Sequence, residues 1–150
     1  MILEIQKIDV QKVYAETDEN GKNLLQKLFD KSIFETKITD KVKSFEDACK
    51  VLGLNYSLSP HFYTADEIAY LKLKVIVKAL NEGWTPDWSD DEEHKYYPWF
   101  DLEKGFVLYD VAYYFTLTSV SSRLCFKSRE LAEYAANQFL DLYKSFMVIA

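Results

Sequence analysis

The chain contains few of the residues on which several common kinds of functional site depend. Its 150 residues include 4 Gly, 3 Pro and 2 Cys. The scarcity of glycine argues against a glycine-rich phosphate loop and against long flexible linkers, because both rely on the backbone freedom of glycine. Cys49 and Cys125 lie far apart in apolar surroundings, so we expect both thiols to be reduced and buried.

Recognisable catalytic motifs are also missing. The sequence has no GxSxG, HExxH, P-loop or CxxC pattern, and His61 and His94 are its only imidazoles. His94 stands among four acidic residues, which could support acid–base chemistry, but no nucleophile, base and orienting group form a set. Burial of Cys125 in a strand is a better interpretation than a nucleophilic role. We therefore predict no catalytic residue and no cofactor.

Long hydrophobic runs are absent as well. No apolar stretch approaches the roughly 20 residues that span a bilayer. Glu4 and Asp9 interrupt the apolar residues at the start of the chain, which is unlike a signal peptide. These features predict a cytoplasmic protein without a membrane partner.

Acidic charge is concentrated in one aromatic segment. The net charge is −6, and residues 84–104 hold seven acidic and two basic side chains, so they account for five of these negative charges. The stretch WTPDWSDDEEHKYYPWF, residues 84–100, contains all three tryptophans. Such a segment can be a structural clamp over the core or a contact surface for another protein. The candidate partner contacts are Trp84, Trp88, Tyr96, Tyr97 and Trp99.

The same segment resembles a calcium loop only at its beginning. Asp87, Ser89 and Asp91 alternate like the first ligands of an EF-hand, but Glu92 stands where the turn glycine belongs. Pro98 then replaces the bidentate glutamate. We predict a solvated loop and no metal site.

One short basic stretch leaves an alternative function open. Arg123, Lys127 and Arg129 are candidate phosphate contacts, although a solvated turn is the simpler interpretation. Stacking of bases on Tyr109, Tyr113 or Phe126 would complete a module that binds single-stranded nucleic acid. The acidic balance of the chain limits any such binding to this local patch.

Helix signals dominate the first half of the chain. Residues 1–14 fit a strand or an amphipathic helix, and Asn23 is expected to cap a short helix. Ser44 and Gly53 are typical of the two ends of a helix, and Thr64 with Glu67 matches a capping box for a helix that runs to Leu80.

Strand signals follow, and then one more helix. The aromatic segment 96–100, the β-branched segment that Gly105 opens, and residues 123–126 are predicted to form an antiparallel three-stranded meander. Ser128 is expected to cap a C-terminal helix docked on this sheet. The prediction is a single α+β domain over residues 1–150, with residues 1–43 as an N-terminal extension.

Two strings carry a family resemblance. KALNEGWTPDWSDDEEHKYYPWF and SSRLCFKSRELAEYAANQFLDLY resemble a group of uncharacterised small proteins from Bacteroides-type bacteria and their phages or prophages, over about residues 44–146. No activity is assigned to that group, so the resemblance implies a phage or mobile-element accessory protein, in the host cytoplasm or in a virion. We predict a non-enzymatic protein that binds an unidentified protein partner, with an enzyme of unidentified class as the third alternative. A homo-oligomer is also compatible with the sequence.

Overall fold

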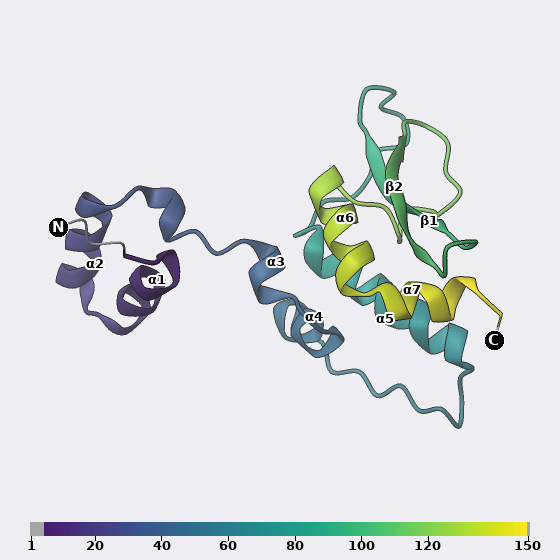
Figure 1. Ribbon diagram of the computed structural model, residues 1–150, viewed down its shortest axis with the longest axis horizontal. Helices are drawn as coiled ribbons and strands as arrows, with labels where there is room; N and C mark the ends of the chain where they lie inside the picture. Colours follow the sequence, from purple (N-terminus) through teal and green to yellow (C-terminus); the bar gives the residue numbers. More distant parts are fainter. Residues whose placement is uncertain (1–4, 150) are drawn as a thin grey trace. The chain divides into compact units, whose positions relative to one another are not determined.

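The computed structural model describes residues 5–149 (Figure 1). One domain was expected for residues 1–150, and the structure divides the chain into two compact units, Met1–Lys37 and Ile38–Ala150. The helices and strands of each unit are described separately.

The first unit is a small helical unit with little buried apolar surface. It contains α1 (Lys7–Glu16), α2 (Glu19–Leu28) and the 3₁₀ helix η1 (Lys31–Ile33). The segment that could have been a strand is therefore helical from Lys7 onward, while residues 1–4 lie outside the described residues. Asp18, and not Asn23, caps α2, because its carboxylate accepts from the backbone N–H of Gly21 at 2.9 Å. Val10 is the one buried hydrophobic side chain among the described residues of this unit.

The second unit begins with helices whose ends follow the sequence signals. They are α3 (Ile38–Lys41), α4 (Phe45–Leu52) and α5 (Ala65–Leu80). The Ser44 hydroxyl accepts from the N–H of Asp47 at 3.1 Å, and Gly53 ends α4 with φ +64°. The Thr64–Glu67 capping box is present at the start of α5. These predictions are confirmed.

The sheet has two antiparallel strands within the described residues, β1 (Lys95–Asp101) and β2 (Val107–Tyr114). Trp99 pairs with Asp110 and Phe100 pairs with Leu108, so Tyr109 is an extra residue in a β-bulge. The α+β class is confirmed, but the predicted three-stranded meander is wrong. Phe126 forms only an isolated bridge, and it pairs with Tyr96 of β1 instead of continuing from β2.

Pro98 explains why residues 123–126 are not a third strand. The N–H and C=O of Phe126 bond Tyr96 at 2.8 and 3.0 Å, so the next rung of an antiparallel ladder would join Leu124 to Pro98. Pro98 has no N–H to donate, and the N–H of Leu124 bonds the carbonyl of Ser121 instead. On the side away from β1, the Asn81 side chain donates to the carbonyl of Cys125 at 2.9 Å and accepts from the N–H of Lys127 at 3.0 Å, which fixes this segment in place.

The C-terminal helix is two helices. Ser128 caps α6 (Arg129–Gln138) as predicted, but the chain leaves helical geometry at Phe139 before α7 (Leu140–Met147). Figure 1 shows α6 beside the sheet and α7 lying along α5. No glycine or proline marks this break, so the packing of the two halves on different partners determines it.

The core of the second unit lies between α4, α5, the sheet, α6 and α7. Its members share near-complete burial. They come from α4, α5, β2, α6, α7 and the segments between these elements, as in Val42, Ala48, Leu73, Ile76, Leu80, Phe106, Val111, Phe126, Ala132, Ala135, Phe139 and Tyr143. Within residues 5–149, none of the helices has both the length and the apolar character needed to cross a membrane.

Candidate functional site

The acidic connection between α5 and β1 is organised around one carboxylate. Glu93 accepts from the indole N–H of Trp84 at 3.2 Å and from the backbone N–H of Asp87 at 2.9 Å. It also pairs with the ammonium of Lys95 at 3.2 Å. These three bonds close residues 84–95 into a structured loop, so this part of the aromatic segment is a clamp.

Lys95 is the buried charge of this clamp. Its side chain is 1% exposed, and its ammonium bonds the carbonyl of Asp90 at 2.9 Å in addition to Glu93. The ammonium also lies 5.6 Å from the centre of the Trp88 ring, within the range of a cation–π contact. A buried ammonium is tolerated when it is paired and hydrogen-bonded in this way.

The five predicted partner contacts have very different exposures. Trp84, Trp88 and Tyr96 are partly buried, and Tyr97 is buried against Tyr114, with ring centres 4.9 Å apart. The indole of Trp88 donates to the Ser122 hydroxyl at 2.6 Å, which ties the connection to the segment before α6. Among the five, only Trp99 is exposed.

A second exposed aromatic residue lies beside Trp99 at the bulge. Trp99 is 56% exposed and Tyr109 is 69% exposed. The bulge places Tyr109 next to Asp110, the residue that faces Trp99 across the ladder. We call Trp99 and Tyr109 the bulge pair. It joins the one exposed residue among the five predicted contacts to an exposed tyrosine of β2.

His94 belongs to a cluster of rings. It stacks on Tyr113 at 4.3 Å, lies edge-on to Phe115 at 4.9 Å, and its Nδ1 is 2.9 Å from the Tyr96 hydroxyl. Among the described residues, no group of three or more His, Cys, Asp or Glu side chains could hold a metal ion. The contacts of His94 are thus with aromatic residues and not with a nucleophile.

Two of the three predicted phosphate contacts are in ion pairs. Lys127 bonds Glu82 at 2.8 Å, and Arg129 bonds Asp110 at 3.0 Å. Of the residues proposed for base stacking, Tyr109 and Tyr113 are exposed but Phe126 is fully buried. The local positive charge that a nucleic acid would need is therefore largely compensated.

Both cysteines are free and buried, as expected. Burial raises the pKa of the Cys125 thiol from 9.0 to about 11, and burial also raises the pKa of Cys49. A thiol with a raised pKa is a poor nucleophile near neutral pH. Cys125 is therefore a core residue.

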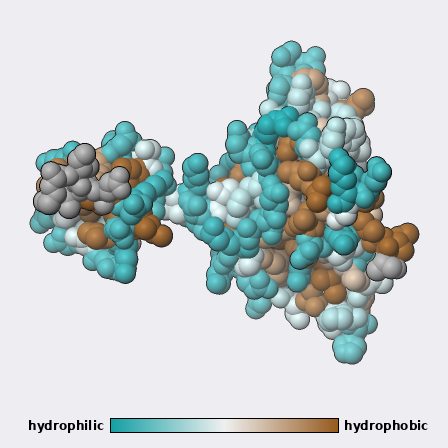
Figure 2. Space-filling view, viewed as in Figure 1, coloured by the Kyte–Doolittle hydropathy of each residue, from teal (hydrophilic) through white to brown (hydrophobic). Residues whose placement is uncertain are grey.

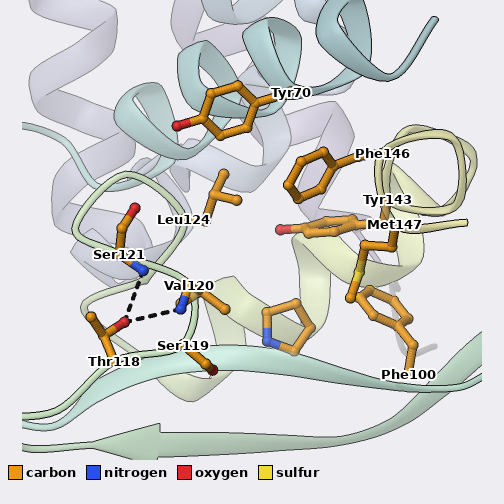
Figure 3. A pocket seen from close by; sticks show the side chains of 11 residues that line it. Tyr70, Phe100, Thr118, Ser119, Val120, Ser121, Leu124, Tyr143, Phe146 and Met147 are labelled. Atoms are coloured by element: carbon orange, nitrogen blue, oxygen red, sulfur yellow. Dashed lines mark hydrogen bonds between the residues drawn. The ribbon is translucent and has the colours of Figure 1, made fainter.

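A cavity lies between α5, α7, β1 and the loop that follows β2 (Figure 3). Its volume is about 520 Å³. Most of the side chains that line it are aromatic or aliphatic, and the others carry a hydroxyl group. The lining residues are Tyr70, Pro98, Phe100, Thr118, Ser119, Val120, Ser121, Leu124, Tyr143, Phe146 and Met147. Figure 2 shows apolar atoms reaching the surface around α7, the helix that supplies one wall.

Local packing and a polar turn shape this cavity. Phe146 stacks on Tyr70 at 5.3 Å, which joins α7 to α5, and Phe100 packs on Tyr143 at 5.0 Å, which joins β1 to α7. Opposite these rings, the Thr118 hydroxyl accepts from the N–H of Ser121 at 2.8 Å. The Thr118 side chain thus satisfies a backbone N–H of its own loop, and the loop keeps its shape as one wall of the cavity.

The hydroxyl of Tyr143 is an unpaired polar group in this cavity. Tyr143 is 3% exposed, and its oxygen is buried without a hydrogen-bond partner among the described residues. Figure 3 shows the hydroxyl end of the ring directed toward the side of the cavity that Leu124 and Val120 line. Burial raises the pKa of this phenol well above its usual range, so the group is a neutral hydrogen-bond donor.

Sequence reasoning did not single out this cavity. Phe146 and Tyr143 belong to the predicted C-terminal helix, and neither is among the candidate site residues. Two aromatic residues three positions apart on the last helix, Tyr143 and Phe146, were the available signal, but that spacing is equally typical of a core face.

Comparisons with known proteins add no identity: no family model, curated protein or solved structure matches the chain.

Proposed function

We propose that the chain is a non-enzymatic interaction protein that binds another protein through the bulge pair. The exposure of Trp99 and Tyr109, at 56% and 69%, carries this proposal. Tryptophan and tyrosine are enriched among the residues that dominate binding energy at protein interfaces.

The bulge makes the pair suitable as an anchor. A β-bulge redirects a side chain while the rest of the ladder stays hydrogen-bonded, so the two rings are presented on a backbone that is already ordered. Large rings on an ordered backbone lose little conformational entropy on binding. This supports a preformed contact and not one that folds on binding.

Charge indicates the chemistry of the partner. Residues 84–104 hold a net charge of −5, and Asp90, Asp91 and Glu92 are exposed in the connection. A partner surface with arginine or lysine around an apolar centre would complement this charge, and arginine can also stack on Trp99. A second copy of the chain would present the same acidic segment, and the repulsion disfavours a symmetric dimer through this surface.

The test compares three baits in an extract of the source organism. These are the unmodified chain, the double variant Trp99→Ala/Tyr109→Ala, and Phe62→Ala as a matched control, because Phe62 is an 82% exposed aromatic residue outside the sheet. A protein captured by the first and third baits but not by the second is then purified. Its affinity should fall about tenfold or more for the double variant, since hot-spot truncations cost about 1.4 kcal/mol or more.

The proposal fails if every purified partner binds the double variant and the unmodified chain with equal affinity. Calorimetric titration at two salt concentrations adds a second criterion, because a basic partner should bind more weakly as salt rises. An affinity that is independent of salt would remove the basic partner from the proposal.

An accessory role for a phage or mobile element belongs to the same proposal, as does a cytoplasmic location. Both rest on the resemblance of residues 44–146 described above and on sequence composition. Binding of single-stranded nucleic acid has less support than protein binding, because Lys127 and Arg129 are already paired with carboxylates. A labelled oligonucleotide that bound at low salt would reverse this ranking.

A further inference from the structure

The cavity between α5, α7 and β1 has the properties of a small-molecule site. Its volume of about 520 Å³ lies within the roughly 300 to 1,000 Å³ of typical ligand pockets. Its walls are mostly aromatic and aliphatic, with a few hydroxyl groups, which is the usual composition of such pockets. None of its 11 lining residues has a charged side chain.

The Tyr143 hydroxyl is the second and independent observation. Burying a hydroxyl without a hydrogen-bond partner is destabilising, and most buried tyrosines therefore have one. Tyr134 shows the usual arrangement in the same protein, because its hydroxyl donates to the carbonyl of Val42 at 2.9 Å. The contrast marks Tyr143 as a donor that is available to a group absent from the chain itself.

We propose that this cavity binds a neutral aromatic small molecule whose carbonyl oxygen accepts a hydrogen bond from Tyr143. Aromatic walls from Tyr70, Phe100 and Phe146 favour a ring system between them. A charged ligand would lose its hydration without meeting an opposite charge, so the lining selects a neutral one. The phenol donates because it stays protonated, and a carbonyl is the simplest neutral acceptor.

Entry requires one side chain to move. Leu124 and Tyr143 are buried at the floor, whereas Met147 is 49% exposed and Phe146 is 36% exposed, so these two lie at the mouth. The Tyr143 oxygen is shielded in the structure, and the carbonyl must therefore displace a covering group. Figure 3 draws Leu124 and Val120 on the side toward which the hydroxyl points, so the group to be displaced is on that side.

The test uses prodan, a neutral naphthalene with a ketone, whose emission responds to polarity and to hydrogen bonding at that ketone. Dimethylnaphthylamine, which lacks the ketone, is the paired ligand. The unmodified full chain should bind prodan, and Tyr143→Phe should weaken prodan binding about fivefold to tenfold. The same substitution should leave the affinity for dimethylnaphthylamine unchanged.

Tyr134→Phe is the matched control, because it removes a hydroxyl that already has a partner. We expect it to lower the melting temperature and to leave prodan binding unchanged. Tyr143→Phe should keep or raise the melting temperature of the free protein, since it removes an unpaired buried group.

Three results would overturn the assignment. One is a lack of prodan binding by the unmodified chain up to the solubility limit of the dye. Another is equal prodan affinity of the unmodified chain and Tyr143→Phe. The last is a melting temperature of Tyr143→Phe that falls as much as that of Tyr134→Phe, because the hydroxyl would then already have a partner within the protein. Trp99 and Tyr109 do not line the cavity, so none of these results bears on the protein-binding proposal.

Discussion

The acidic connection and the apolar cavity differ in whether their buried polar groups have hydrogen-bond partners. In the connection, the ammonium of Lys95 is almost fully buried, yet it bonds both Glu93 and the carbonyl of Asp90. In the cavity, the less costly hydroxyl of Tyr143 is buried without any such partner among residues 5–149. The group that is more expensive to bury is satisfied, and the cheaper one is not.

This difference separates a structural role from a binding role better than composition does. The connection has the unusual composition, with tryptophans and excess acid, but its contacts are directed inward and hold the fold. The cavity has an ordinary composition, and its one polar anchor is left unused by the fold. An unusual composition therefore does not by itself show which residues of a segment are free to bind.

Removing the charge of Glu93, the centre of the clamp, should produce the largest loss of stability. Glu93→Gln keeps an acceptor for Trp84 but leaves the charge of Lys95 without a counter-ion. Removing one partner of a buried pair costs about 3 to 5 kcal/mol. Because the Glu93 side chain is 26% exposed, we expect a loss below this range, about 2 to 3 kcal/mol in the free energy of unfolding, measured by urea denaturation.

The neighbouring substitution Glu92→Gln is the control for this prediction. Glu92 is exposed, and we expect its replacement to change stability by less than about 0.5 kcal/mol. The double variant Glu93→Gln/Lys95→Met should recover part of the loss, because it removes the uncompensated charge as well. Equal stabilities of Glu93→Gln and Glu92→Gln would contradict the clamp.

Alkaline pH should lower the free energy of unfolding first through Cys125, beside the connection, and only at higher pH through Tyr143 in the cavity. The loss should be smaller than that of Glu93→Gln. The Cys125 thiol, beside the connection, has a folded-state pKa of about 11 against an ordinary value of 9.0. As pH rises past about 9, the unfolded chain loses this proton first, so the contribution of the neutral thiol to stability is complete below that pH and declines until about pH 11.

At about pH 10 the linked loss is about 1 kcal/mol, and Cys125→Ala should remove it. Tyr143 in the cavity has an ordinary pKa of 10.0 that burial raises, so its contribution declines only at higher pH. Urea denaturation at a series of pH values would show the order in which the two contributions decline. A Cys125→Ala variant with the same pH dependence as the unmodified chain between about pH 9 and 10 would contradict it.

Removing the hydrogen bond between Trp88 and Ser122 should produce the smallest loss of stability. Trp88→Phe keeps a ring near Lys95 but removes the indole N–H that bonds the Ser122 hydroxyl. Because both groups are partly exposed to water, we expect a loss of about 0.5 to 1 kcal/mol. A double-mutant cycle with Ser122→Ala measures the bond itself, and a coupling energy of zero would show that the contact does not hold the connection in place.

Local signals explain which parts of the fold could be predicted from the sequence. Ser44, Thr64 and Ser128 cap helices through bonds to residues three positions away, so each signal and its partner lie in one short stretch. The break at Phe139 and the position of the segment around Cys125 depend on distant contacts. Asn81 reaches across 44 residues to Cys125, and no pattern near Cys125 indicates this.

The candidate sites show the same limit. Aromatic residues at 84–100 were visible as a feature, but their exposure depends on which strand face and which loop they meet. Trp99 is exposed and Tyr97 is buried although they are two positions apart on β1, because the clamp and Tyr114 lie toward one end of the strand. Whether the Tyr143 hydroxyl has a partner is likewise a property of the assembled core.

The thin core of residues 5–37 has a consequence for how unfolding is observed. This unit buries Val10 while Ile5, Ile8, Val13, Leu24 and Leu28 stay more than half exposed. So little buried apolar area stabilises a unit of this size weakly. All three tryptophans lie in the other unit. Tryptophan emission will therefore follow the melting of residues 38–150 alone, while circular dichroism will also record the loss of α1 and α2, and the two midpoints need not coincide.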